Sequence, residues 1–351
     1  MNWQQRRSIS PIGLDIGSRQ IKLAQLASAP GGCRLAARAV LDRAADAAAL
    51  TPDEVRRMRN VLERQGFHGN RLVIAAPPGK LACEMFELPP RSSGAPVDQI
   101  ARAEIARTAR LGQNDFEIAM WDLPAPTRAT GATSVMAVAL KEADALSLLD
   151  PLEDSGLDVV ALDAPGWALA RACAAMDGRA GEITAVLDVG WSASTIVLLG
   201  NASILCQRSL HELGVGVLYR EVMSQLAVGD KAADFLVTSM EGALAPEQQS
   251  GSRWQWIDDQ IRQYADSLSD EVRASFAYAA HRYPALPVKS LHLAGGGASV
   301  RGLSALLGER LRVESRTLTD FDLSIVNGDA GQPNQAALLA LAVGLARHGK
   351  E

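Results

Sequence analysis

The sequence lacks the features that mark several classes of protein. Only 4 of its 351 residues are cysteine, they lie far apart, and none forms a C-x-x-C pair. This argues against a disulfide framework or a cysteine-rich metal site, and predicts free thiols in a reducing compartment. No stretch approaches the roughly 18 apolar residues of a membrane span, and the first ten residues are polar and basic, unlike a signal peptide. Basic residues form no long run and the net charge is −5, so nucleic acid is not an expected partner.

Common catalytic motifs are missing as well. His211-Glu212 is not followed by a second histidine, because position 215 is valine, so the H-E-x-x-H zinc motif is absent. Ser209 lacks the flanking glycines of a G-x-S-x-G nucleophile elbow. The sequence therefore gives no support for a zinc protease or an α/β-hydrolase.

What the chain does contain is an approximate internal repeat. Strands are predicted at 11–16, 21–27 and 34–41, and again at 184–188, 194–199 and 203–209, with a D-x-G turn after the first strand of each set. The repeat predicts an α/β protein of two lobes, residues 1–180 and 181–351. We expect an inserted small subdomain at about 80–161 and a subdomain of the second lobe at about 205–290.

The remaining elements follow from periodicity and end signals. Thr51 and Pro52 predict the start of a helix that ends near Gly66. Strands are expected at 72–76, 85–88, 117–122, 133–140, 159–163 and 290–293, and helices at 97–109, 141–155, 166–175, 215–226, 231–238, 256–283 and 334–346. The last helix is almost wholly apolar, which predicts that it is buried.

Three segments carry the candidate chemistry: D-x-G turns at 15–17 and 188–190, and a glycine cluster at 295–297 that follows a strand. A D-x-G turn can offer backbone N–H groups and serine hydroxyls to phosphate oxygens. Asp15 and Asp188 would hold Mg²⁺ through water, and Lys22 would neutralise phosphate charge. The glycines would let the backbone approach a nucleoside, and a helix expected to begin near Ser299 would point its N-terminus at a phosphate.

Each motif alone is usually an ordinary turn or loop, but their order and flanking strands make the set more specific. The set predicts a nucleotide site with ATP and Mg²⁺ as cofactors. The candidate residues are Asp15, Gly17, Ser18, Arg19, Gln20, Lys22, Asp188, Gly190, Ser192, Ser194, Thr195, Gly214, Gly295, Gly296, Gly297 and Ala298, with Asp15 and Asp188 at the metal.

The order of two phosphate motifs and a nucleoside motif resembles the actin-like ATPase superfamily. Within it, nearly the whole chain resembles the PilM family of type IV pilus assembly proteins, and more distantly the division protein FtsA. The resemblance rests on residues 12–17 (I-G-L-D-I-G), 86–89 (F-E-L-P), 100–105 (I-A-R-A-E-I), 155–158 (S-G-L-D), 168–169 (A-L), 187–190 (L-D-V-G) and 293–296 (L-A-G-G).

The resemblance implies an actin-like fold with two ribonuclease-H-like lobes around a nucleotide cleft. It also implies a cytoplasmic scaffold, peripheral at the inner membrane through its partners, that recruits the N-terminal cytoplasmic peptide of a PilN-like bitopic protein. Pilus assembly ATPases are further candidate partners, and a related secretion or pseudopilus system is an alternative setting. We expect the peptide to dock in an apolar groove between the inserted subdomain and the first lobe, beside Met85, Phe86, Leu88, Ile100 and Ile105. The alternative is that these residues only close the core of the small subdomain itself.

Two departures from the family pattern concern turnover. Pro165 stands where the family often carries glutamate, and the family's A-E-x-x-K segment appears only as Ala233-Asp234 without the lysine. We therefore expect at most a weak ATPase. A sugar-type kinase of the same superfold and an FtsA-like division protein stay open as alternatives. No acidic residue stands out as the base that a kinase needs, and no basic amphipathic tail of the FtsA kind follows residue 341.

Overall fold

The computed structural model describes residues 9–43, 49–77, 79–112, 115–125, 131–176, 181–201, 203–239, 251–326 and 335–349, without the side chains of 251 and 252. The polar segment 1–8 and position 334 of the predicted last helix lie outside these ranges. None of the helices in the described part of the chain is both long and apolar enough to cross a membrane. All four cysteines are free thiols.

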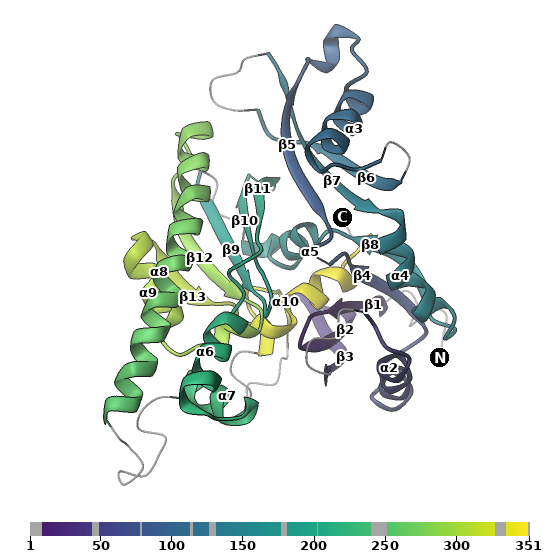
Figure 1. Ribbon diagram of the computed structural model, residues 1–351. Coiled ribbons are helices and arrows are strands. Elements are labelled where there is room, and N and C mark those ends of the chain that lie inside the picture. The colour runs from purple at the N-terminus through teal and green to yellow at the C-terminus, as the bar shows by residue number, and fades with distance from the viewer. Residues whose placement is uncertain are drawn as a thin grey trace.

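Two five-stranded sheets share one topology (Figure 1). In each, three antiparallel strands are continued by two parallel strands, so the predicted repeat is confirmed. The first sheet has the order β3-β2-β1-β4-β8, with β1 (Ile9–Ile16), β2 (Gln20–Ala29), β3 (Gly32–Asp42), β4 (Arg71–Ala75) and β8 (Asp158–Asp163). The second has the order β11-β10-β9-β12-β13, with β9 (Ile183–Val189), β10 (Ser194–Gly200), β11 (Ser203–Leu210), β12 (Val288–Ala294) and β13 (Glu314–Thr317). The short edge strand β13 was not predicted.

Helices α2 (Pro52–Arg64) and α4 (Glu142–Glu153) cover the outer face of the first sheet. A capping box fixes the start of α2, where Thr51 accepts from the Glu54 N–H and Glu54 accepts from the Thr51 N–H. Apolar side chains spaced three and four residues apart then face the sheet, because that spacing returns to one side of a helix. They are Val55, Met58 and Leu62 on α2, with Leu148 and Leu152 on α4.

Helices α5 (Pro165–Ala172) and α10 (Gln335–Ala346) lie between the two sheets and join the cores of both lobes (Figure 1). Two glycines permit this close packing. A Cβ on Gly13 of β1 would collide with the carbonyl oxygen of Ala342, and a Cβ on Gly344 of α10 would collide with that of Ala168. As predicted, α10 is buried around nearly its whole circumference.

The second lobe is covered by α6 (Gly216–Leu226), α7 (Asp230–Thr238), α8 (Gly251–Arg282) and α9 (Leu303–Leu311). Ile257, Ile261, Tyr264, Leu268 and Val272 of α8 are buried, and their spacing of three or four residues places them on one face of the helix. The helix expected near Ser299 was wrong. A 3-10 turn spans Gly296–Ser299, Val300 is extended, and Gly302 has a φ of 68°, so α9 begins only at Leu303.

A separate three-stranded sheet, β5-β7-β6, is inserted after β4: β5 (Ala82–Leu88), β6 (Phe116–Asp122) and β7 (Thr133–Lys141), with α3 (Val97–Thr108) on one face. Of the predicted insertion at about 80–161, the part from α4 onward packs with the first sheet instead. Short 3-10 turns lie at Arg91–Ser93 and Ala174–Met176.

Most of the apolar side chains expected to line a docking groove pack between α3 and the small sheet. Phe86 and Leu88 of β5 pack with Ile100 of α3, and Ile105 of α3 packs with Phe116 of β6. Leu88 and Ile105 are therefore buried in the core of the small sheet, whereas Phe86 and Ile100 are only half-buried there, and the docking groove itself stays a prediction.

Candidate functional site

The first D-x-G turn joins β1 to β2. The Gly17 N–H donates to the Gln20 carbonyl at 3.0 Å and closes the turn. The antiparallel register places Lys22 directly opposite Asp15, and its Nζ donates to Asp15 Oδ2 at 2.8 Å. Two residues seven positions apart thus become an ion pair at the end of a buried strand.

The second D-x-G turn joins β9 to β10 in the other lobe. The backbone at the start of α6 is hydrogen-bonded to this turn. The Val215 N–H donates to the Gly190 carbonyl and the Gly216 N–H donates to the Trp191 carbonyl, both at 2.9 Å. A Cβ on Gly214 would strike the Trp191 carbonyl, so glycine is needed for the loop to pass beneath the turn. The turn is therefore held by hydrogen bonds to its backbone.

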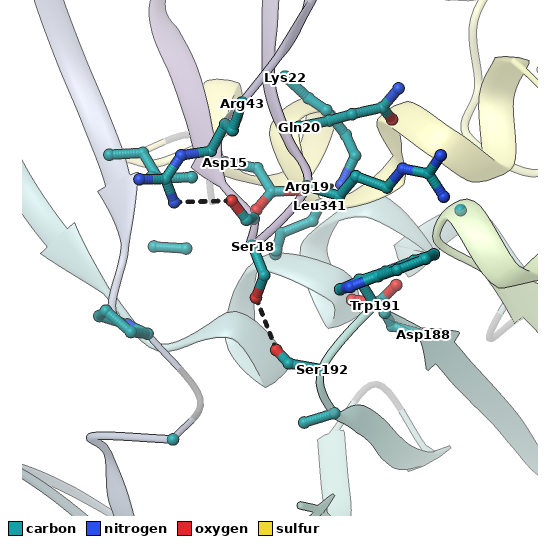
Figure 2. A pocket seen from close by; sticks show the side chains of 18 of the residues that line it. Asp15, Ser18, Arg19, Gln20, Lys22, Arg43, Asp188, Trp191, Ser192 and Leu341 are labelled. Atoms are coloured by element: carbon teal, nitrogen blue, oxygen red, sulfur yellow. Dashed lines mark hydrogen bonds and ion pairs between the residues drawn. The ribbon is translucent and has the colours of Figure 1, made fainter. Parts of the chain in front are cut away.

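The two turns meet across the interlobe cleft (Figure 2). Ser18 Oγ and Ser192 Oγ are hydrogen-bonded at 2.7 Å. The Arg19 guanidinium carbon lies 4.4 Å from the Trp191 ring centroid and 5.4 Å from that of Tyr219, which are cation–π distances. Side chains 174 positions apart in the sequence thus connect the lobes.

A cavity of about 1370 Å³ surrounds this meeting point. Its lining contains most of the predicted site residues: Asp15, Gly17, Ser18, Arg19, Gln20, Lys22, Asp188, Gly190, Ser192, Thr195 and Gly296. It also includes residues that the sequence did not single out, among them Arg43, Lys80, Asp144, Trp191 and Tyr219.

Five predicted residues, Ser194, Gly214, Gly295, Gly297 and Ala298, are not part of that lining. The Ser194 hydroxyl is fully buried and donates to the Leu213 carbonyl at 2.6 Å. A Cβ on Gly295 would strike the Asp188 carboxylate, and one on Gly297 would strike Val189. These two glycines therefore make room for the second turn, and only Gly296 of the cluster faces the cavity.

The charges in the cleft influence one another. Burial raises the pKa of Asp188 to about 6, with Lys22 opposing the shift and Asp15 adding to it. Burial alone would lower the pKa of Lys22, but attraction to Asp15 and Asp188 outweighs it and raises that pKa above its ordinary value. Lys22 thus stays a cation between two carboxylates, which suits a site for a charged ligand.

The structure shows the surroundings of Pro165 and Asp234, the two positions that the sequence linked to turnover, and of Asp163 next to Pro165. Pro165 lies in the cavity lining at the start of α5 and supplies no carboxylate. Asp163, which ends β8, is hydrogen-bonded to Arg171. Asp234 accepts a hydrogen bond from the Tyr219 hydroxyl at 2.9 Å. Among the described residues, no group of three His, Cys, Asp or Glu side chains could hold a metal ion.

The unpredicted cavity residues carried little sequence signal. Arg43 directly follows the third strand of the first repeat, a position without a recognised motif. Trp191 directly follows the second D-x-G motif, where a bulky aromatic residue could have been noticed.

Comparisons with known proteins concern the family and the fold of the chain. The sequence model of the family described as "Type IV pilus assembly protein PilM" matches residues 13–350. A structure described as "PilM-PilN type IV pilus biogenesis complex" is 21% identical, with a TM-score of 0.78 over 98% of this chain and 99% of that one. The comparison with curated protein sequences finds no match.

Two further structures are more distant. Ethanolamine utilization protein EutJ from Carboxydothermus hydrogenoformans is 15% identical, with a TM-score of 0.55 over 96% of this chain and 88% of that one. MreB 5 of Spiroplasma citri, bound to AMPPNP, is 10% identical, with a TM-score of 0.51 over 97% and 95%.

Proposed function

The chain belongs to the type IV pilus assembly protein PilM family and has the actin-like ATPase fold, and from this premise we propose a nucleotide-binding scaffold of pilus assembly. It would bind ATP with Mg²⁺ in the interlobe cleft. It would work in the cytoplasm and recruit the N-terminal peptide of a PilN-like bitopic protein of the inner membrane.

The observation that carries nucleotide binding is the meeting of the two D-x-G turns. Ser18 and Ser192 bring hydroxyl donors to one point of the cavity, and Lys22 adds a cation nearby. Hydroxyls, backbone N–H groups and a lysine are the donors that phosphates require. A structure of similar fold is described as bound to AMPPNP.

The carboxylates suit a magnesium ion held together with phosphates. Mg²⁺ usually keeps several waters and takes only one or two protein carboxylates besides the phosphates. Asp15 and Asp188 supply that number and face one cavity. The ion would supply charge neutralisation, while Lys22 holds Asp15 in place.

Thermal unfolding tests nucleotide binding. A ligand that binds only the folded state raises the melting temperature by mass action. We expect ATP with Mg²⁺ to raise it and Asp15→Ala to remove most of the Mg²⁺ dependence. The proposal is wrong if ATP, ADP and GTP at millimolar concentrations all leave the melting temperature unchanged.

Partner recruitment is supported by the match to a structure described as a PilM-PilN complex. Other elements of this chain contact both faces of the small sheet. Helix α3 packs on one; on the other, Tyr278 of α8 hydrogen-bonds to Met85 and Trp121 packs against Trp167 of α5. An extended peptide would therefore add to the outer strand β5 or β6, where main-chain hydrogen bonds give affinity.

Calorimetry with the N-terminal peptide of a PilN-like protein tests this docking mode. We expect an affinity on the order of micromolar, because ordering the peptide offsets part of its binding energy. Glu84→Lys on β5 or Glu117→Lys on β6 should weaken binding. Arg273→Glu, an exposed charge reversal on α8, is the matched control. Equal affinities in all variants would exclude the two sheet edges.

A further inference from the structure

Arg43 is the most extensively bonded cation near the first D-x-G turn. Its backbone N–H donates to the Arg19 carbonyl at 2.9 Å, and its Nη1 donates to the Gly17 carbonyl at 3.0 Å. One residue therefore holds the carbonyl groups at both ends of the three-residue segment that forms the turn.

The guanidinium is itself fixed on the other side. Its Nε donates to Glu54 Oε1 at 2.9 Å and its Nη2 to the Ala49 carbonyl at 2.8 Å. The side chains of Arg43 and Glu54 are only 4% and 3% exposed. Glu54 also belongs to the capping box of α2, so the helix start and the turn are joined through a single arginine.

Electrostatics favour the paired state. Burial acts to raise the pKa of Glu54, but hydrogen bonds from Arg43 and Thr51 hold it below its ordinary value. The two charges cancel, so Arg43 adds little net charge to the cleft. Its effect on a ligand must come from geometry.

That geometry concerns the N–H groups of the turn. A trans peptide plane directs its N–H opposite to its carbonyl. Because the Gly17 carbonyl points to Arg43, the Ser18 N–H points away from Arg43. Figure 2 shows Arg43 and Trp191 of the second lobe on opposite sides of this turn.

We infer that Arg43 is a positioning residue for phosphate: it orients the first D-x-G turn so that the Ser18 N–H faces an anion in the cleft. This inference rests on the proposed nucleotide binding. Arg43 would not touch the nucleotide itself.

The test compares ATP affinity with the stability of the free protein. Arg43→Lys keeps a cation beside Glu54, but one ammonium group cannot reproduce the planar fork that reaches Glu54, Gly17 and Ala49. The double variant R43M/E54L removes both charges and so leaves no unpaired buried charge, although it also removes the Glu54 half of the capping box. Both should bind ATP roughly tenfold more weakly, the loss of one hydrogen bond to an anion.

Arg316→Met is the matched control. Arg316 pairs with buried Asp322, which accepts from the Thr319 N–H and hydroxyl much as Glu54 does from Thr51. It lies outside the cavity lining, so this variant should lose stability while ATP affinity stays within twofold.

The inference is overturned if folded Arg43→Lys and R43M/E54L bind ATP within twofold of the wild type, or if Arg316→Met loses the same affinity. If the wild type binds no nucleotide, the proposed function fails and the inference fails with it. Urea unfolding at the titration temperature establishes that each variant is folded.

Discussion

Asp188 and Asp322 are two aspartates whose pKa values the fold shifts in opposite directions. Burial raises the pKa of Asp188 from 3.8 to about 6. Asp322 is also buried, which acts to raise its pKa, but hydrogen bonds from Arg316 and Thr319 prevail and lower it to about 2. Replacing each by asparagine removes the charge at nearly constant size, so the two variants should change stability with opposite signs.

The magnitudes follow from the shifts. One pKa unit corresponds to about 1.4 kcal/mol, so keeping Asp188 ionised costs up to about 3 kcal/mol at neutral pH. The contribution of Asp188 to the free energy of unfolding is highest below pH 4, and it falls as the pH rises through about 6. The ionised form of Asp322 contributes about 2 kcal/mol, present above pH 4 and lost as pH falls toward about 2.

Urea unfolding from pH 3 to pH 8 measures both effects. At pH 7 we expect Asp188→Asn to be more stable than the wild type and Asp322→Asn to be less stable. The advantage of Asp188→Asn should vanish toward pH 4. A difference between wild type and Asp188→Asn that does not change over this range would refute the raised pKa and with it the electrostatic account of the cleft.

Three other substitutions or assays follow from the packing and the site. Gly13→Ala should destabilise the protein by more than the ~1–3 kcal/mol of ordinary overpacking, because the new methyl group meets backbone atoms. Gly229→Ala, with open space around the new methyl group, should cost under about 1 kcal/mol in urea unfolding. Thr51→Ala should cost about 1 kcal/mol by the same measurement, since it removes half of the capping box. Phosphate release from ATP should stay far below the ~1–100 s⁻¹ of kinases; turnover in that range that is lost in Asp188→Ala would contradict the role given to Pro165.

The sequence predicted the architecture well, because local patterns determine it. The two sets of strands, the start of α2 at Thr51 and the buried face of α8 depend on periodicity and end signals within a few residues. The helix placed near Ser299 was wrong for a local reason, since Gly302 takes a left-handed conformation and delays the start of α9. Strand β13 was missed because it has 4 residues, E-S-R-T, with no apolar alternation.

The site was harder to predict, because its contacts join distant segments. The D-x-G motifs identified Asp15 and Asp188, yet no motif marks Arg43 or Tyr219, whose roles appear only when loops and helices meet. The apolar residues of the insertion, such as Phe86 and Ile105, illustrate the converse limit. Amphipathic alternation predicts a buried face but cannot tell whether a partner or the chain's own helix covers it.

The cleft is where the chain departs from what stability alone would favour. Asp188 is ionised at neutral pH although burial opposes it, and Arg43 and Glu54 bury a pair that apolar side chains often replace without loss. Both features lie at the D-x-G turns, while the buried core of each lobe consists mainly of leucine, isoleucine, valine and alanine. These charges beside the D-x-G turns suit the charged ligand proposed above, since functional sites commonly retain such arrangements at the expense of stability.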